Sequence, residues 1–112
     1  MFRKLLPCAV VISSCIVPLA HAADAKIVAF FEETCGACHG TKGEGTPGLA
    51  PPLKGSAFVM QASPAEIAAV ITKGRIGDQK KFPNLPSPMP ANALSENRLN
   101  GIVAYVRNEI QK

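Results

Sequence analysis

Five residues, Cys35-Gly36-Ala37-Cys38-His39, constrain the fold of this chain more than any other feature of its sequence. Two thiols three positions apart, followed at once by an imidazole, have the spacing typical of a c-type haem attachment site. Each thiol can add across one vinyl group of a haem, and the adjacent imidazole can then bind the iron as its proximal ligand. The motif therefore predicts one haem c, attached through Cys35 and Cys38 and ligated by His39.

Two other kinds of site share part of this spacing. A thiol–disulfide redox pair usually accompanies a strand–helix–strand pattern, whereas the segments of this sequence have helical or loop character. A structural zinc site usually has four Cys or His ligands. Beyond residue 22 the sequence offers only Cys35, Cys38 and His39, so zinc would need a carboxylate or an open position. Haem is the favoured interpretation, and the dithiol and the metal site stay as alternatives.

The first 22 residues have the pattern of an export signal. Arg3-Lys4 forms a positive region, residues 5–19 are mostly apolar, and Ala20-His21-Ala22 is a cleavage signal of the A-x-A type. We therefore expect residues 1–22 to be a signal peptide and residues 23–112 to form the mature domain in the periplasm.

The N-terminal segment permits two further interpretations. Ile12-Ser13-Ser14-Cys15 resembles a bacterial lipobox, in which Cys15 would carry a lipid and tether the protein to a membrane. A retained membrane anchor is the third possibility, but the apolar run is near the lower length for a span and contains Pro7 and Pro18. Cleavage after Ala22 is favoured because the A-x-A signal ends the apolar run cleanly, so no membrane span is expected in the mature chain.

The expected mature chain is short and almost neutral. Its 90 residues suit one domain, and a domain of this size often needs a covalent or metal staple, which an attached haem would provide. Arg3 and Lys4 are two of the 12 basic residues, so their removal lowers the net charge from +4 to +2. Two haem propionates would bring it near zero, and charge therefore gives no support to nucleic-acid binding.

The hydrophobic pattern predicts an all-α fold with three main helices and long loops. In residues 24–34, Ile27, Phe30 and Phe31 recur at steps of three and four, which indicates one apolar helical face. Residues 40–58 are dense in glycine and proline and are expected to be loop.

The second and third helices carry recognisable end signals. The second is expected over 64–73, with Ser63 as N-cap, Glu66 completing a capping box and Gly74 ending the helix. A proline-rich loop should follow over residues 75–92. The last helix is expected to begin after Ser95, with Leu94 and Leu99 as a hydrophobic staple, and to end near Gln111.

The sixth iron ligand has few candidates. His39 is the sole histidine after the predicted signal, which excludes two-histidine ligation within one mature chain and leaves Met, Lys, a backbone group, water or nothing. Met89 lies between Pro88 and Pro90, and prolines on both sides fix the backbone that presents the thioether. Met60 has apolar neighbours and is expected to fill the core. Met89 is therefore the predicted ligand.

Ligation by His39 and Met89 would close both faces of the iron and raise its reduction potential. A closed iron disfavours chemistry with dioxygen or peroxide, so these residues predict a one-electron carrier rather than an enzyme. Two alternatives remain at this point. One is a cytochrome subunit stably bound to a periplasmic dehydrogenase, and the other is a haem sensor or peroxidase with an open iron.

From about Phe31 to Tyr105 the chain resembles the small bacterial class I cytochromes c. The resemblance rests on five features in chain order. Phe31 is the aromatic residue of the first helix, and Cys35, Cys38 and His39 form the haem motif. Pro51-Pro52-Leu53-Lys54-Gly55 matches a Pro-x-Leu-x-Gly loop, Met89-Pro90 matches a Met-Pro pair, and Tyr105 is the aromatic residue of the last helix.

This resemblance implies the class I fold, with the first and last helices crossing closely beside a single haem. It implies that the carbonyl group of Pro51 accepts the proton of the His39 ring and so tunes the iron. As a diffusing periplasmic carrier, the protein would shuttle single electrons between respiratory redox partners, with a dehydrogenase or reductase as donor and an oxidase or reductase as acceptor.

The chain departs from the family pattern at Ile27, where the family often has glycine, and the bulkier side chain argues against the closest form of the helix crossing. Arg75 is a candidate partner for a haem propionate, because arginine suits carboxylates. Lys42, Lys80 and Lys81 are candidates for a docking surface with weak electrostatic attraction to a partner, although ordinary solvated lysines are an equal interpretation.

Overall fold

The computed structural model describes residues 10–12, 23–77, 80–82, 84–85 and 87–112. Most of the predicted signal segment, including Cys15, and positions 78, 79, 83 and 86 of the predicted loop lie outside these ranges. The described part contains helices and two isolated bridges but no strand, in the order α1 (Ala25–Phe30), η1 (Phe31–Cys35), α2 (Gly36–His39), α3 (Ala57–Gln61), α4 (Pro64–Lys73), α5 (Glu96–Ala104) and η3 (Tyr105–Glu109). The predicted all-α fold is confirmed.

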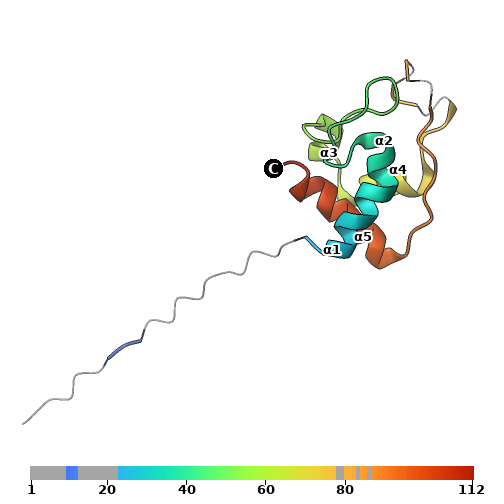
Figure 1. Ribbon diagram of the computed structural model, residues 1–112. Helices are drawn as coiled ribbons and strands as arrows, with labels where there is room; N and C mark the ends of the chain where they lie inside the picture. The colour runs from blue at the N-terminus through green and yellow to red at the C-terminus, as the bar shows by residue number, and fades with distance from the viewer. Residues whose placement is uncertain (1–9, 13–22, 78–79, 83, 86) are drawn as a thin grey trace, which may run out of the picture.

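The first three elements form one continuous helix that runs from residue 25 to residue 39 (Figure 1). The side chain of Asp24 accepts a backbone hydrogen bond at its start, and Gly40, with φ of 83°, ends it. The predicted range of 24–34 was too short. Gly36 does not end the helix, because it directly follows the π-helical segment η1 in a helical conformation and its amide donates to the carbonyl group of Phe31. The helix therefore carries the whole Cys-x-x-Cys-His motif.

Helix α3 lies partly in the segment that the sequence predicted as loop. Its N-cap is Ser56, whose hydroxyl oxygen accepts a hydrogen bond from the amide of Val59 at 3.4 Å. The helix turns Val59 into the core, where it is 3% exposed, and turns Met60 outward, where it is 52% exposed. The prediction that Met60 fills the core is wrong.

Helices α4 and α5 follow their sequence signals closely. The Ser63 hydroxyl accepts from the amide of Glu66 at 3.2 Å, while the Glu66 carboxylate accepts from the amide of Ser63 at 2.7 Å, so the predicted capping box is confirmed. Gly74 ends α4, and Ser95 caps α5, also as predicted. The last helix continues through the π-helical segment η3 and ends at Glu109, two residues before the predicted end.

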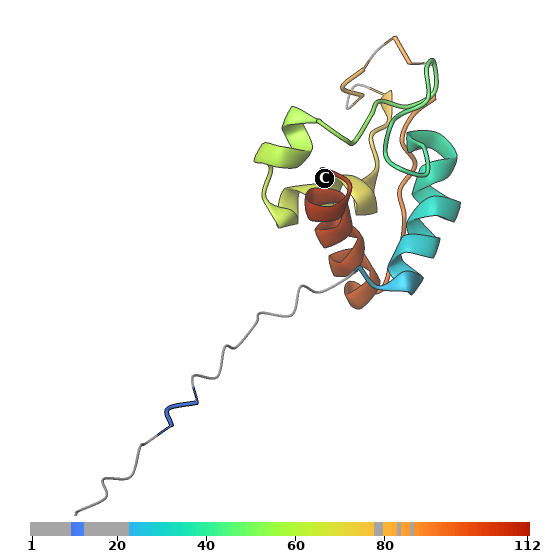
Figure 2. The same ribbon diagram turned by 60° about the vertical axis from the view of Figure 1, so that its left-hand side comes forward.

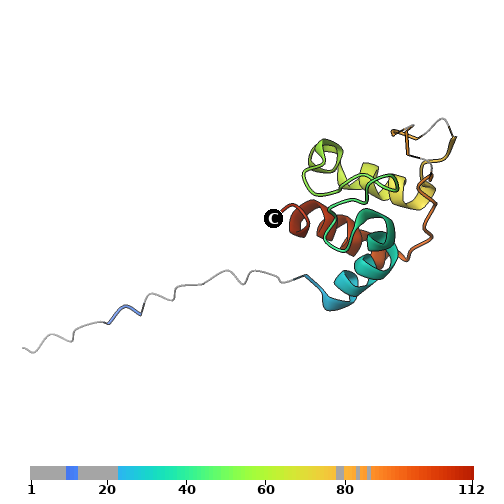
Figure 3. The ribbon, with the colours of Figure 1, turned by 45° about the horizontal axis from the view of Figure 1, so that its top comes forward.

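Helix α5 lies between the first helix and α4 (Figures 2 and 3) and contacts both. Its buried side chains join those of the flanking elements in one core of the described residues, made by Phe31, Val59, Ala62, Ile67, Ile71, Ile102, Val103, Val106 and Ile110. Between the first and last helices, the rings of Phe31 and Tyr105 meet edge to face with centroids 5.2 Å apart. Phe31 is the first residue of η1, and Tyr105 is the first residue of η3.

Ile27 of the first helix packs against Gly101 of the last helix. A Cβ atom on Gly101 would lie 2.6 Å from Cδ1 of Ile27, so the isoleucine occupies the space that the glycine leaves open. Ile27 is accommodated at this contact because the small residue, Gly101, stands on the other helix.

Candidate haem site

A cavity of about 490 Å³ opens beside the first helix, and its walls are mostly apolar. The first helix contributes Cys35, Cys38 and His39, the following loop contributes Pro51, and the segment after α4 contributes Met89. The structure thus brings every site residue predicted from the sequence to the lining of one cavity. Arg75, Lys80 and Lys81 also line it, whereas Lys42 lies elsewhere and Met60 is outside.

The two cysteines reach the cavity because residues three positions apart share one face of a helix. No disulfide joins Cys35 and Cys38, and both side chains are half-buried. Burial raises the pKa of the Cys35 thiol to about 11. A catalytic thiol–disulfide pair needs a thiol whose pKa is lowered, because the thiolate is the nucleophile. Cys35 is therefore poorly suited to act as the nucleophile of a dithiol pair.

The loop that follows His39 contacts both its imidazole and its backbone carbonyl group. Its Nδ1 lies 2.9 Å from the carbonyl oxygen of Pro51. Because a carbonyl oxygen can only accept, Nδ1 must carry the proton and Nε2 is left as the free ligand atom. The carbonyl oxygen of His39 itself accepts from the amide of Gly45 at 2.6 Å. These contacts present Nε2 in one orientation.

Close backbone packing in the loop sets the position of the Pro51 carbonyl group. Gly45 has φ of 80°, and a Cβ atom there would lie 2.6 Å from the backbone nitrogen of Pro52. Residue 45 must therefore be glycine for two reasons, since the conformation is left-handed and the space is filled.

Met89 is held by backbone contacts to the end of α4. Its amide donates to the carbonyl group of Arg75 at 3.1 Å, and its own carbonyl group accepts from the amide of Arg75 at 2.8 Å. Gly74, with φ of 70°, permits this approach, because a Cβ atom there would lie 2.5 Å from the carbonyl oxygen of Met89. The half-buried Met89 packs against the core cluster.

Positive side chains gather on the wall of the cavity that follows α4. The Arg75 guanidinium and the Lys81 ammonium group lie 4.8 Å and 4.9 Å from the ring centroid of Phe58. The Lys80 ammonium group donates to the carbonyl oxygen of Leu85. Among the described residues that line the cavity, no aspartate or glutamate balances these charges. Sequence patterns did not reveal the role of Phe58, because cation–π contacts join residues far apart in the chain.

These residues suit a haem on chemical grounds. The apolar walls match a porphyrin face, two thiols share one helical face, Nε2 of His39 is unengaged, and the thioether of Met89 lines the same space. A zinc site has less support, because the described residues contain no group of three or more His, Cys, Asp or Glu side chains placed to hold a metal ion.

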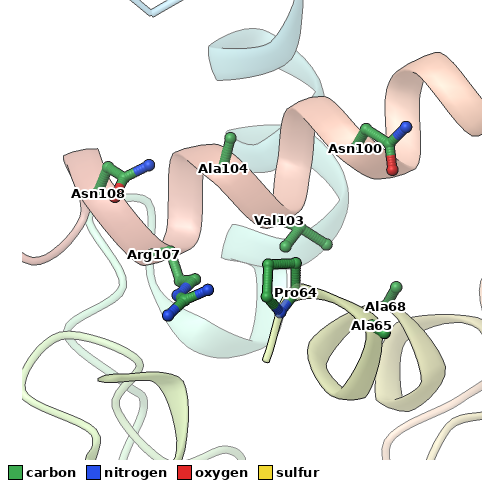
Figure 4. Close-up of a pocket in the computed structure, with 8 residues that line it drawn as sticks. All are labelled: Pro64, Ala65, Ala68, Asn100, Val103, Ala104, Arg107 and Asn108. Carbon is green, nitrogen blue, oxygen red and sulfur yellow. The ribbon is translucent and has the colours of Figure 1, made fainter. Parts of the chain in front are cut away.

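A second cavity, of about 560 Å³, lies between α4 and the last helix (Figure 4). Its lining consists of small apolar side chains, two asparagines and Arg107 at one end. No Cys, His or Met lines it, so it offers a haem neither an attachment point nor an iron ligand.

Across the residues that the structure describes, no helix combines the length and the apolar character needed to cross a membrane.

Comparison with known proteins gives one family and a consistent fold. The family model described as "Cytochrome C oxidase, cbb3-type, subunit III" matches residues 22–106. No match is found among curated proteins.

Solved structures of c-type cytochromes share the fold. The c-type cytochrome XoxG from Methylobacterium extorquens AM1 is similar with a TM-score of 0.57 and 22% identity, over 77% of this chain and 49% of XoxG, so the chain spans about half the length of that protein. The c-type cytochrome NirC is similar with a TM-score of 0.54 and 21% identity, over 76% of this chain and 88% of NirC. Both likenesses show the class I fold.

Proposed function

This chain belongs to the cytochrome c family described as cbb3-type cytochrome c oxidase subunit III, and on this premise we propose that it is a periplasmic one-electron carrier with a single haem c. Membership of the family makes it a c-type cytochrome, which carries electrons and is not an enzyme. Its haem number, location, ligands and partners are the content of the proposal.

In the proposed site, the sulfur atoms of Cys35 and Cys38 would form the thioether bonds to the haem, and His39 and Met89 would be the iron ligands. The observation that carries this assignment is the meeting of both candidate ligands and both thiols in one apolar cavity, although Met89 lies far from the motif in the sequence. When bound, haem supplies a one-electron couple between ferric and ferrous iron.

The protein residues prepare the site for electron transfer rather than for catalysis. Pro51 orients His39 and keeps the proton on Nδ1. The bridge to Arg75 fixes the backbone at Met89. The apolar walls exclude water and favour the iron state with less net charge, which raises the reduction potential. Because both ligands are held before any electron arrives, little rearrangement accompanies transfer.

An optical titration of variants tests the ligand assignment. Ferric haem with a bound thioether shows a weak charge-transfer band near the red edge of the visible spectrum. The wild-type protein and Met60→Ala should show this band, and Met89→Ala should lose it. Met60→Ala is the matched control, because Met60 is an exposed methionine outside the cavity. Loss of the band in Met60→Ala alone would overturn the assignment.

We further propose that cleavage after Ala22 produces a mature domain of residues 23–112. Two observations support this division: the family match begins at residue 22, and the first helix cap is Asp24. Mass spectrometry of the protein isolated from its native host separates a chain that begins at Ala23 from one that begins at a lipid-modified Cys15.

A second candidate function is that of a cytochrome subunit stably bound to a periplasmic dehydrogenase. Two exposed apolar side chains in the segment that follows α4 favour this function. They are Ile76 and Phe82, which are 55% and 48% exposed. The carrier model instead uses Lys80 and Lys81 beside them for weak docking. Purification of the native protein decides between the two, since copurification with a large subunit through high salt favours the permanent complex.

A further inference from the structure

The side chain of Gln111, which follows the last helix, uses its whole amide group in hydrogen bonds. Its Nε2 donates to the carbonyl oxygens of Leu53 at 2.9 Å and Val106 at 3.1 Å. Its Oε1 accepts from the amide of Gly55 at 2.8 Å. One side chain thus joins the end of η3 to the loop at residues 53–55, and Figure 1 shows the C-terminal end beside this part of the chain.

A second contact at the end of the last helix fixes the same loop. The amides of Leu53 and Lys54 both donate to the carbonyl oxygen of Gly43, at 2.8 Å and 2.9 Å. Gly43 lies directly under Ile110, because a Cβ atom on Gly43 would be 2.7 Å from the Ile110 Cγ2 atom. Ile110 and Gln111 therefore hold the two halves of the loop together.

The loop fixed in this way carries the hydrogen-bond partner of His39. The carbonyl group of Pro51 accepts from His39 Nδ1, and it lies only two residues before Leu53. Between them stands Pro52, and the ring of each proline fixes its own φ, so this connection is stiff. Gly45, whose amide donates to the carbonyl oxygen of His39, packs against the Pro52 backbone from the other side. A displacement at Leu53 is therefore passed to the Pro51 carbonyl group rather than absorbed.

We propose that Gln111 is a positioning residue for His39: it fixes the loop 51–55, and through this loop it sets the strength of the hydrogen bond from His39 Nδ1 to Pro51. The inference rests on the proposed function in one respect, namely that His39 binds the iron. A strong hydrogen bond at Nδ1 makes the ligand more basic and stabilises the ferric state. Loosening the loop should weaken this bond and raise the midpoint potential.

The test uses the full-length holoprotein and Gln111→Leu, which keeps the apolar part of the side chain and removes all three hydrogen bonds. Exchange of the Gly55 amide hydrogen should become about fivefold faster, the factor that corresponds to one net hydrogen bond of about 1 kcal/mol. The midpoint potential should shift to a more positive value while the sulfur–iron band stays in place.

Two controls separate positioning from general effects. Gln61→Ala removes another glutamine side chain, exposed at the end of α3, and Lys112→Ala removes the exposed neighbour that pairs with Glu109. Neither control should change the potential or the exchange of Gly55. A merely structural role for Gln111 predicts lower stability with an unchanged potential, and this result would overturn the proposal.

A second variant keeps the proposal testable if Gln111→Leu does not fold. Pro52→Ala softens the connection between Leu53 and Pro51 without touching Gln111, and it should also shift the potential upward. An unchanged potential in Pro52→Ala then overturns the inference. Failure of the proposed function is seen separately, because it would leave the optical spectrum of His39→Ala equal to that of the wild type.

Discussion

The two sides of the cavity hold their proposed iron ligands in different ways. On the histidine side, His39 is oriented by Pro51, and the loop behind Pro51 is held by Ile110 and Gln111 at the far end of the chain. On the methionine side, Met89 is held by a short bridge to Arg75 at the end of the preceding helix and by its two flanking prolines.

This difference predicts how the two proposed ligands should respond to amino-acid substitutions. The nitrogen ligand depends on contacts between segments distant in sequence, so changes in the last helix should reach it. Met89 depends on its flanking prolines and on the bridge to Arg75, so its main sensitivity should lie at the junction of α4 and the following loop. Each side contains a tightly packed glycine and a glycine in open space, which provides matched pairs for testing.

The largest effect is expected for Gly74→Ala on the methionine side. The new Cβ atom would lie 2.5 Å from the Met89 carbonyl oxygen and 2.7 Å from the Ala91 nitrogen, in a left-handed conformation. We expect a loss of about 4 kcal/mol in the free energy of unfolding, from backbone strain and overpacking together, and a weaker sulfur–iron band. Denaturant titration and the optical spectrum measure the two effects.

The control for this change is Gly77→Ala, where φ is 57° but a Cβ atom would meet nothing within 4 Å. Only the conformational strain of about 1 kcal/mol should remain. Equal losses in the two variants would show that the contact between Gly74 and the Met89 backbone contributes nothing.

The corresponding change on the histidine side is Gly45→Ala, which places a Cβ atom 2.6 Å from the Pro52 nitrogen. We expect a loss of about 3 kcal/mol in unfolding free energy and a shifted midpoint potential, because the partner of His39 must move. Gly48→Ala is the control, since φ there is 75° and the space is open. A sulfur–iron band weakened as strongly as in Gly74→Ala would contradict the independence of the two sides.

A smaller effect is expected at the crossing of the first and last helices. Gly101→Ala would bring a Cβ atom within 2.6 Å of Ile27 and should cost about 2 kcal/mol through overpacking. The double variant with Ile27→Ala should recover part of this loss, because the smaller side chain makes room. A double-mutant cycle of unfolding free energies measures the coupling, and additive losses would mean that the two residues do not share this space.

The smallest effect concerns pH and the cap of α4, away from both ligands. Hydrogen bonds from the backbone and side chain of Ser63 lower the pKa of the Glu66 carboxyl below its ordinary value near 4.5. A lowered folded-state pKa stabilises the protein above the ordinary pKa, and this contribution is lost as the pH falls through the folded-state value. Glu66→Gln should therefore flatten the acid limb of the stability curve, measured by denaturant titration from pH 6 downward, with the sulfur–iron band unchanged.

The sequence was sufficient for features that local chemistry determines. Such features depend on neighbouring residues, as do the haem motif, the capping box of Ser63 and Glu66, and the helix end at Gly74. In the structure, α4 begins and ends at the residues that these two helix signals predicted. The first helix was predicted over 24–34, but its continuation through the haem motif to residue 39 was missed, because the apolar period ends before the motif.

Features that depend on distant contacts could not be found in the same way. Helix α3 is a five-residue element without a hydrophobic period, and its cap at Ser56 gives the only local signal. The contact of Ile27 with Gly101 joins the first and last helices, and the hydrogen bonds of Gln111 join the end of the chain to the loop at residues 53–55. A single sequence does not show which of its small or polar residues will meet, so these contacts required the fold.

The most direct test of the central claim is the mass of the purified holoprotein under denaturing conditions. Covalent attachment through both cysteines predicts a mass equal to that of the polypeptide plus one haem, with neither Cys35 nor Cys38 reactive toward a thiol reagent. The double variant Cys35→Ala with Cys38→Ala should give the mass of the polypeptide alone. A wild-type chain that loses its haem on denaturation, or that has both thiols free, would contradict the account.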